Sequence, residues 1–228
     1  TSDLTASGTG SIDLTAGLNI VSSNALSVVS VVDGNLTLSA NAAGNSGNFV
    51  GFAHRGQLLS TGSGSISITA KGGNAAGGQH GISLESNSQI VSSGSGLITL
   101  DGTAGGVSGI SDGVKLGSTG NASITSSGSG DVTLIGRLGG GSGSVGFRGL
   151  NAATINTSAG SGTLVIRADL IDTSTGANFA INAGTNQVVL RQQTNGTPLT
   201  VGTNSTSFWG LNDGQLDRIT AGTLRIGD

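Results

Sequence analysis

The sequence contains no cysteine, so disulfide bonds, thiol chemistry and cysteine-based zinc sites are excluded. Charged residues make up 9% of the chain, against about 25% in ordinary globular domains, and aromatic residues make up 3%. Proline occurs once, and no apolar run approaches the roughly 18 residues that a membrane-spanning helix needs. With a net charge of −3, the chain also lacks the basic patch that nucleic-acid binding requires.

Glycine, by contrast, accounts for 43 of the 228 residues, well above an ordinary share of about 7%. A disordered linker is disfavoured, because disordered chains combine low hydrophobicity with high charge and this chain is 35% hydrophobic. Collagen is excluded, because glycine does not recur at every third residue. The apolar residues are mostly Ile, Leu and Val, which favour β-strands. The composition therefore predicts an ordered all-β chain.

A Gly-Ser-Gly triplet followed by an alternating apolar strand recurs four times along the chain. The copies read GSGSISI, GSGLITL, GSGDVTL and GSGTLVI, and they begin at residues 62, 94, 128 and 160. Weaker copies occur at residues 8–14, 33–38, 183–190 and 221–226, which gives about eight units.

Two further apolar segments follow each triplet. The second segment opens on glycine and a bulky apolar residue, at Gly51-Phe52, Gly81-Ile82, Gly109-Ile110 and Gly146-Phe147, with Phe179 and Phe208 or Trp209 in the same place later. The third segment precedes the next triplet, at Leu58-Leu59-Ser60, Ile90-Val91-Ser92, Ile124-Thr125-Ser126 and Ile155-Asn156-Thr157. Each unit is therefore predicted as strand, glycine-rich loop, strand, short turn, strand and turn.

One unit cannot bury its alternating apolar face alone, whereas stacked units bury a continuous core. We therefore predict one domain over residues 1–228, a right-handed parallel β-helix (β-solenoid) of about eight coils of three short strands. Coils about 4.8 Å apart would make a rod on the order of 40 Å long. Like residues should stack in columns: Phe52, Ile82, Ile110 and Phe147; Ile66, Ile98, Val132 and Leu164; Ile68, Leu100, Leu134 and Ile166. A helical turn is expected near residues 211–216, capped by Asn212 or Asp213.

The triplet units, the Gly-Phe and Gly-Ile second strands and the ending WGLNDGQLDRITAGTLRIGD (residues 209–228) resemble large repetitive bacterial exoproteins. The family they resemble is the filamentous-haemagglutinin-like adhesins, with related autotransporter passengers. This resemblance implies a β-helix shaft, export across the outer membrane and a role in adhesion or surface structure. The chain begins at Thr1 without Met, and we expect it to be one segment of a longer array.

Two histidines are candidates for a binding or acid–base pair. His54 follows the second-strand residue Phe52, and His80 precedes the second-strand residue Ile82 of the next unit, so the two side chains are candidates for neighbours in stacked coils. The favoured interpretation is two exposed polar loop residues, because serine is abundant near any histidine of this chain.

Glycoside hydrolysis depends on paired carboxylates, and β-helix polysaccharide lyases depend on clusters of acidic and basic side chains on one strand face. The aspartates Asp101, Asp131 and Asp169 lie near equivalent strand positions but out of register, and Asp172 lies close to Asp169. The basic residues Lys71, Lys115, Arg137, Arg148, Arg167 and Arg191 are scattered, so a solvated surface is expected. The nonapeptide calcium motif is absent, and we predict no catalytic, cofactor-binding or metal site.

The predicted function is therefore a non-enzymatic, extracellular rod of a bacterial surface protein. Its expected partners are other copies of itself, joined end to end, and a host or matrix surface. The alternative is a carbohydrate-binding or polysaccharide-degrading β-helix, in which Phe49, Phe208 and Trp209 would stack on sugars if exposed; burial in the core or at one end is favoured. An ice-binding face needs a regular Thr-x-Thr pattern and is disfavoured, because the threonines do not align from coil to coil.

Overall fold

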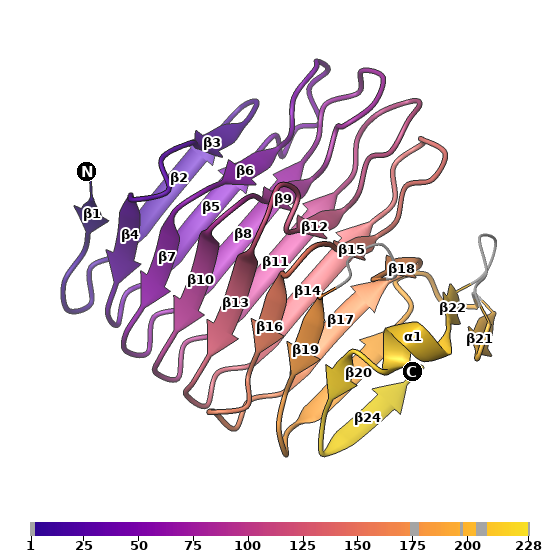
Figure 1. Ribbon diagram of the computed structural model, residues 1–228. Coiled ribbons are helices and arrows are strands. Elements are labelled where there is room, and N and C mark those ends of the chain that lie inside the picture. Colours follow the sequence, from indigo (N-terminus) through magenta and orange to yellow (C-terminus); the bar gives the residue numbers. More distant parts are fainter. Residues whose placement is uncertain (1–2, 174–177, 197, 204–208, 228) are drawn as a thin grey trace.

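The computed structural model describes residues 3–173, 178–196, 198–203 and 209–227, and it consists almost wholly of parallel β-strands. The strands follow one another in a repeating order through three sheets, so the chain is the predicted β-solenoid (Figure 1). The two ends of the chain lie at opposite ends of the stack. Among the described residues, no helix has the length and apolar character that crossing a membrane requires.

Sheet A contains the strands formed by the third apolar segment of each unit. Its members are β1 (Leu4–Thr5), β4 (Val28–Val31), β7 (Gln57–Ser60), β10 (Ser88–Ser92), β13 (Ala122–Ser126), β16 (Thr154–Asn156), β19 (Ala180–Asn182) and β23 (Ile219–Thr220).

Sheet B contains the strands that follow the Gly-Ser-Gly triplets. Its members are β2 (Ile12–Ala16), β5 (Leu36–Ala40), β8 (Ile66–Lys71), β11 (Ile98–Thr103), β14 (Val132–Arg137), β17 (Leu164–Ala168), β20 (Gln187–Arg191) and β24 (Thr223–Ile226).

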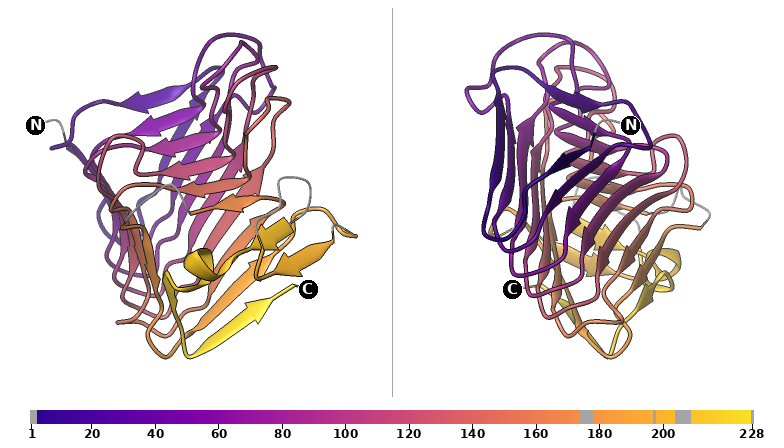
Figure 2. Two further views of the ribbon diagram at one scale, coloured as in Figure 1. Left: turned by 45° about the vertical axis from the view of Figure 1, so that its right-hand side comes forward. Right: turned by 90° about the vertical axis from the view of Figure 1, so that its left-hand side faces the viewer.

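Sheet C contains the strands of the second apolar segment, reached from sheet B through long glycine-rich loops that project from the stack (Figure 2). Its members are β3 (Ile20–Ser22), β6 (Phe52–His54), β9 (Ile82–Leu84), β12 (Val114–Leu116), β15 (Phe147–Gly149) and β18 (Ile171–Asp172). Sheets A and B thus reach the predicted eight strands, but the complete three-sheet turns number six. In the later units, β21 (Leu199–Val201), β22 (Trp209–Leu211) and the helix α1 (Asp213–Leu216) stand in place of sheet C.

The register confirms two of the three predicted columns. Ile66, Ile98, Val132 and Leu164 are directly paired from strand to strand, and so are Ile68, Leu100, Leu134 and Ile166. All eight side chains are buried, and complete burial of one Leu or Ile side chain contributes about 1.5–3 kcal/mol. Alternation at period two, anchored by a triplet at a fixed offset, was therefore enough to fix sheet B.

The third predicted column is wrong at one position. Phe52 pairs with Ile82 as expected, but Ile82 pairs with Val114 rather than Ile110. Ile110 is 52% exposed in the loop before β12, and Gly109 lies in a turn with a φ of +73°. Strand β12 begins after the next glycine, Gly113. The loop before it is therefore longer than expected from a strand that starts at Gly109-Ile110.

The aromatic residues expected to continue this column do not do so. Ile171 pairs with Phe147 and takes the place assigned to Phe179, which packs against the Phe147 ring with centroids 6.0 Å apart. Trp209 lies in β22, outside sheet C. Phe208 lies outside the described residues.

Hydroxyl side chains align on part of the outer face of sheet B, but threonine does not recur from coil to coil, as expected, because Ser67 interrupts the column and Val165 ends it. Thr37, Ser67, Thr99 and Thr133 are paired on four successive strands. The second outward position of these strands carries Ser39, Thr69, Asp101 and Ile135, so the regular hydroxyl pattern covers only part of the face.

Serine stacking closes the corner between sheets A and B. Ser92 Oγ donates to the carbonyl oxygen of Gly96 at 2.8 Å, and Ser126 Oγ donates to that of Gly130 at 3.0 Å. Each serine ends a strand of sheet A and bonds to the second glycine of the following triplet. The triplets therefore serve as corners, and their backbones are held by buried hydroxyls.

Candidate functional site

A row of polar side chains runs along the outer face of sheet C. Ser83, Lys115, Arg148 and Asp172 are paired in register on β9, β12, β15 and β18. They alternate with inward apolar residues, which places them on the outer face. The three charged residues of this row and two residues of the preceding loops form the sheet C cluster, which consists of His80, Asp112, Lys115, Arg148 and Asp172.

Arg148 lies at the centre of the sheet C cluster and is 8% exposed. Its Nε donates to Asp112 Oδ2 at 2.8 Å, its Nη1 is paired with the carboxylate of Asp172, and its Nη2 donates to the Gly143 carbonyl oxygen at 2.8 Å. Asp112 is fully buried and also accepts from the backbone N–H of Val145 at 3.1 Å. The guanidinium therefore joins two carboxylates from different turns, and both charges of the buried pair are compensated.

His80 extends the cluster by one turn towards the N-terminus. Its Nδ1 accepts a hydrogen bond of 2.9 Å from the backbone N–H of Asp112, and its Nε2 lies 3.2 Å from Lys115 Nζ. Burial lowers the pKa of His80 to about 4, and the positive charges of Lys115 and Arg148 act in the same direction. Burial also lowers the pKa of Lys115. His80 is therefore neutral at physiological pH. Protonation of Nδ1 would also replace its hydrogen bond with a repulsive contact to the backbone N–H of Asp112.

The structure does not bring the two histidines together as a pair. His54 points into the core from β6, where it stacks on Phe52 with ring centroids 5.6 Å apart, and it aligns with Leu84 rather than His80. Burial lowers the pKa of His54 to about 4. Both histidines are buried, so the interpretation as exposed loop residues is wrong.

The aspartates singled out from the sequence have separate roles. Asp101 aligns with Ile135 and forms an ion pair with Arg137. Asp131 Oδ1 accepts from the backbone N–H of Thr163 at 2.7 Å. Asp169 holds the start of the loop after β20, where Oδ1 accepts from the backbone N–H of Gln193 at 2.9 Å. These three aspartates hold local backbone or surface pairs, and only the neighbouring Asp172 joins the sheet C cluster.

The hydrogen-bonded pairs of this cluster are separated by 24 to 36 residues in the chain. The cluster was therefore not predicted from the sequence. Treating the arginines as solvated was wrong for Arg148. A signal was present: Lys115 and Arg148 each follow a glycine and a bulky apolar residue, at Gly113-Val114 and Gly146-Phe147. That shared position predicts neighbouring side chains on one sheet face once the strands are set in register.

Two of the three aromatic side chains proposed for sugar stacking are described, and one of them, Trp209, has no exposed face on which a sugar could stack. Trp209 is fully buried, so its expected burial is confirmed. Phe49 is half-buried, and Phe208 lies outside the described residues.

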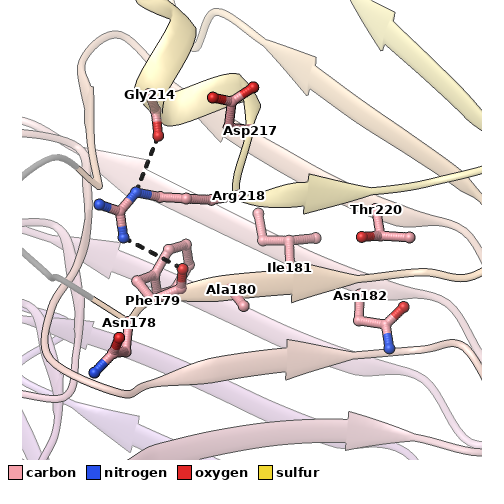
Figure 3. Close-up of a pocket in the computed structure, with 9 residues that line it drawn as sticks. All are labelled: Asn178, Phe179, Ala180, Ile181, Asn182, Gly214, Asp217, Arg218 and Thr220. Atoms are coloured by element: carbon pink, nitrogen blue, oxygen red, sulfur yellow. Dashed lines mark hydrogen bonds between the residues drawn. The ribbon is translucent and has the colours of Figure 1, made fainter.

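A second candidate site lies where α1 meets the last strands of sheet A (Figure 3). This terminal groove has a volume of about 600 Å³. It is lined by Asn178, Phe179, Ala180, Ile181, Asn182, Gly214, Asp217, Arg218 and Thr220. The paired strands β19 and β23 form its floor, and the end of α1 forms its wall.

Helix α1 confirms the helical turn expected near residues 211–216. Asn212 is the N-cap: its side chain accepts from the backbone N–H of Gln215, and the Gln215 side chain accepts from the backbone N–H of Asn212. This reciprocal capping box fixes the position of the short helix beside the groove.

Within the part of the chain that the structure describes, no three His, Asp or Glu side chains come together as a metal site would require. Comparison of the chain with protein-family models, curated protein sequences and solved structures found no match.

Proposed function

We propose that this chain is a non-catalytic structural segment of an extracellular bacterial surface protein, a rod that spaces or presents adhesive parts. The observation that carries the proposal is the continuity of the stack: sheets A and B each run through eight strands in one parallel register. In such an array each turn is supported by its neighbours, so length follows from the number of turns. That property suits a shaft.

The chemistry of the sheet C cluster supports a structural role over a catalytic one. Arg148 forms ion pairs with Asp112 and Asp172. Asp112 is fully buried, so its carboxylate cannot reach a substrate. His80 is engaged by Asp112 and Lys115. The cluster instead links four successive turns on the side where the chain makes its longest loops.

The extracellular location and the bacterial surface rest on the resemblance of the triplet units and of residues 209–228 to filamentous-haemagglutinin-like adhesins. The partners we propose follow from the same resemblance: further copies of the protein and a host or matrix surface. A chain without cysteine is also suited to export and to an oxidising exterior, because it has no thiol that could form a wrong disulfide.

The proposal is tested by removing residues 1–228 in frame from the protein in the source bacterium. Antibodies against another part of that protein should still label intact cells, and the labelled layer should lie closer to the cell by on the order of 40 Å. Adhesion of the cells should fall. Labelling only after permeabilisation, or breakdown of polysaccharides by the purified chain, would contradict the proposal.

A further inference from the structure

The terminal groove presents hydrogen-bond donors and acceptors together, and we propose that it binds a neutral pyranose unit of a glycan. This inference goes beyond a structural role, since a shaft needs no ligand. A volume of about 600 Å³ is within the range of about 300–1,000 Å³ that small-molecule sites occupy.

The groove floor offers an oriented amide and a hydroxyl. Asn182 Oδ1 accepts from the backbone N–H of Gly184 at 3.1 Å, and this bond fixes the carboxamide. The Asn182 Nδ2 group forms no hydrogen bond with the described residues, so its two N–H donors remain for a ligand. Thr220 is paired beside Asn182 on β23 and is exposed, so its hydroxyl supplies a second polar group about 4.8 Å away.

The groove wall offers an acceptor and a held guanidinium. Asp217 is exposed, and its carboxylate forms no hydrogen bond or ion pair with the described residues. Arg218 Nε donates to the Gly214 carbonyl oxygen at 3.0 Å, and its Nη1 donates to that of Phe179 at 3.5 Å (Figure 3). These bonds hold the guanidinium across the end of the groove.

This set of groups favours a neutral polyhydroxylated ligand. The charges of Asp217 and Arg218 are equal and opposite, so the lining as a whole attracts neither an acidic nor a basic ligand. Sugar hydroxyls can donate to the Asp217 carboxylate on the groove wall and accept from the Asn182 amide on the floor, and neither interaction requires a charged ligand. Between these groups Ala180 leaves a small apolar floor for the C–H face of the ring.

The sheet also provides a path for a longer glycan along the rod. Asn182 aligns with Asn156 on β16, and Asn156 Oδ1 accepts from the backbone N–H of Ser158 at 3.0 Å in the same local turn. The two carboxamides are therefore presented in one orientation on successive turns, about 4.8 Å apart. The next sugar unit can contact Asn156 while the first occupies the groove.

The test uses the whole 228-residue chain and calorimetric titration with neutral tetrasaccharides of glucose, mannose and galactose, with an acidic uronate tetrasaccharide for comparison. At least one neutral tetrasaccharide should bind. Asp217→Ala removes the acceptor and Ala180→Leu fills the floor, and each should weaken binding at least tenfold. Asp13→Ala, an exposed aspartate on sheet B, is the matched control and should bind as the parent chain does.

Melting temperatures of all variants are measured alongside, and Asp217→Ala alone decides the test if Ala180→Leu does not fold. Absence of binding to every neutral tetrasaccharide at millimolar concentration would overturn the proposal. So would binding that survives Asp217→Ala, or preference for the uronate. Each of these results leaves the in-frame deletion experiment on the rod unaffected, so the two proposals can fail separately.

Discussion

Gln215 joins the short helix α1 to the last strand of sheet C, because its Nε2 donates a hydrogen bond of 3.0 Å to the carbonyl oxygen of Ile171. The same side chain accepts from the backbone N–H of Asn212 at 2.9 Å through Oε1. An edge strand otherwise presents unpaired backbone groups. One buried amide therefore completes the helix cap and satisfies a carbonyl group at the sheet edge.

Replacing Gln215 by Ala should lower the free energy of unfolding by about 1–2 kcal/mol, because both bonds are lost and the Ile171 carbonyl stays buried. Denaturant unfolding measures the loss, and hydrogen exchange should accelerate first in α1 and β18. Gln187→Ala, at an exposed position that begins β20, is the control and should change stability by less than about 0.5 kcal/mol. Equal effects of the two substitutions would show that Gln215 has no special role.

The buried ion pair of the sheet C cluster gives a larger expected effect. Arg148→Met leaves the fully buried Asp112 carboxylate without its partner, and such a loss typically costs about 3–5 kcal/mol. Arg148→Lys keeps a positive charge but loses the second branch of the guanidinium, so its cost should be smaller. Adding Asp112→Asn to Arg148→Met should recover part of the stability, because it removes the unpaired charge. Thermal unfolding of these variants checks the order.

The control for this series is Arg225→Met, at an exposed position of β24, which should lie within about 0.5 kcal/mol of the parent chain. Failure of Asp112→Asn to improve Arg148→Met would mean that the lost packing of the arginine, rather than the unpaired carboxylate, dominates.

Stability should fall in mild acid because of the two buried histidines. The pKa of both His54 and His80 is lowered to about 4 in the folded chain, from an ordinary value of 6.5. The unfolded chain therefore binds more protons between these values, so stability is full above pH 6.5 and is lost as the pH falls towards 4. Within this pH window, each histidine should lower the free energy of unfolding by up to about 1.4 kcal/mol per pH unit.

Unfolding midpoints measured from pH 7.5 to 4 check this expectation. The groups that face His80 are Lys115, Asp112, Arg148 and Glu85, so the double variant His54→Gln and His80→Gln is compared with the parent at every pH. The variant should be less stable at pH 7.5 but should lose less stability on acidification. Parallel curves for the two proteins would contradict the assigned role of the histidines.

The sequence was sufficient to predict the strands whose position is set by a nearby triplet. It was insufficient to predict the strands whose position depends on the length of the loop before them. The columns through Ile66 and Ile68 follow from alternation at a fixed distance from a triplet. Val114 was missed because the loop before it contains a second Gly-apolar pair, at Gly109-Ile110, and only the energy of the stacked register decides between them. The sheet C cluster was missed for a related reason, since contacts such as that between Arg148 and Asp112 exist only after the turns are in register.

The glycines of the triplets pack directly against backbone of the neighbouring turn, and they provide a sharp stability test. A methyl group added at Gly96 would overlap the carbonyl oxygen of Gly64 on the neighbouring turn, where backbone leaves no room for relief. Gly17 has no atom within 4 Å of the same position. Both substitutions restrict the unfolded chain equally, so the difference between them reports the contact alone.

Gly96→Ala should lower the free energy of unfolding by about 1–3 kcal/mol, as overpacking does, while Gly17→Ala should be neutral or slightly stabilising. Denaturant unfolding of the two variants decides, and equal stability would mean that the triplets are not the close contact between turns.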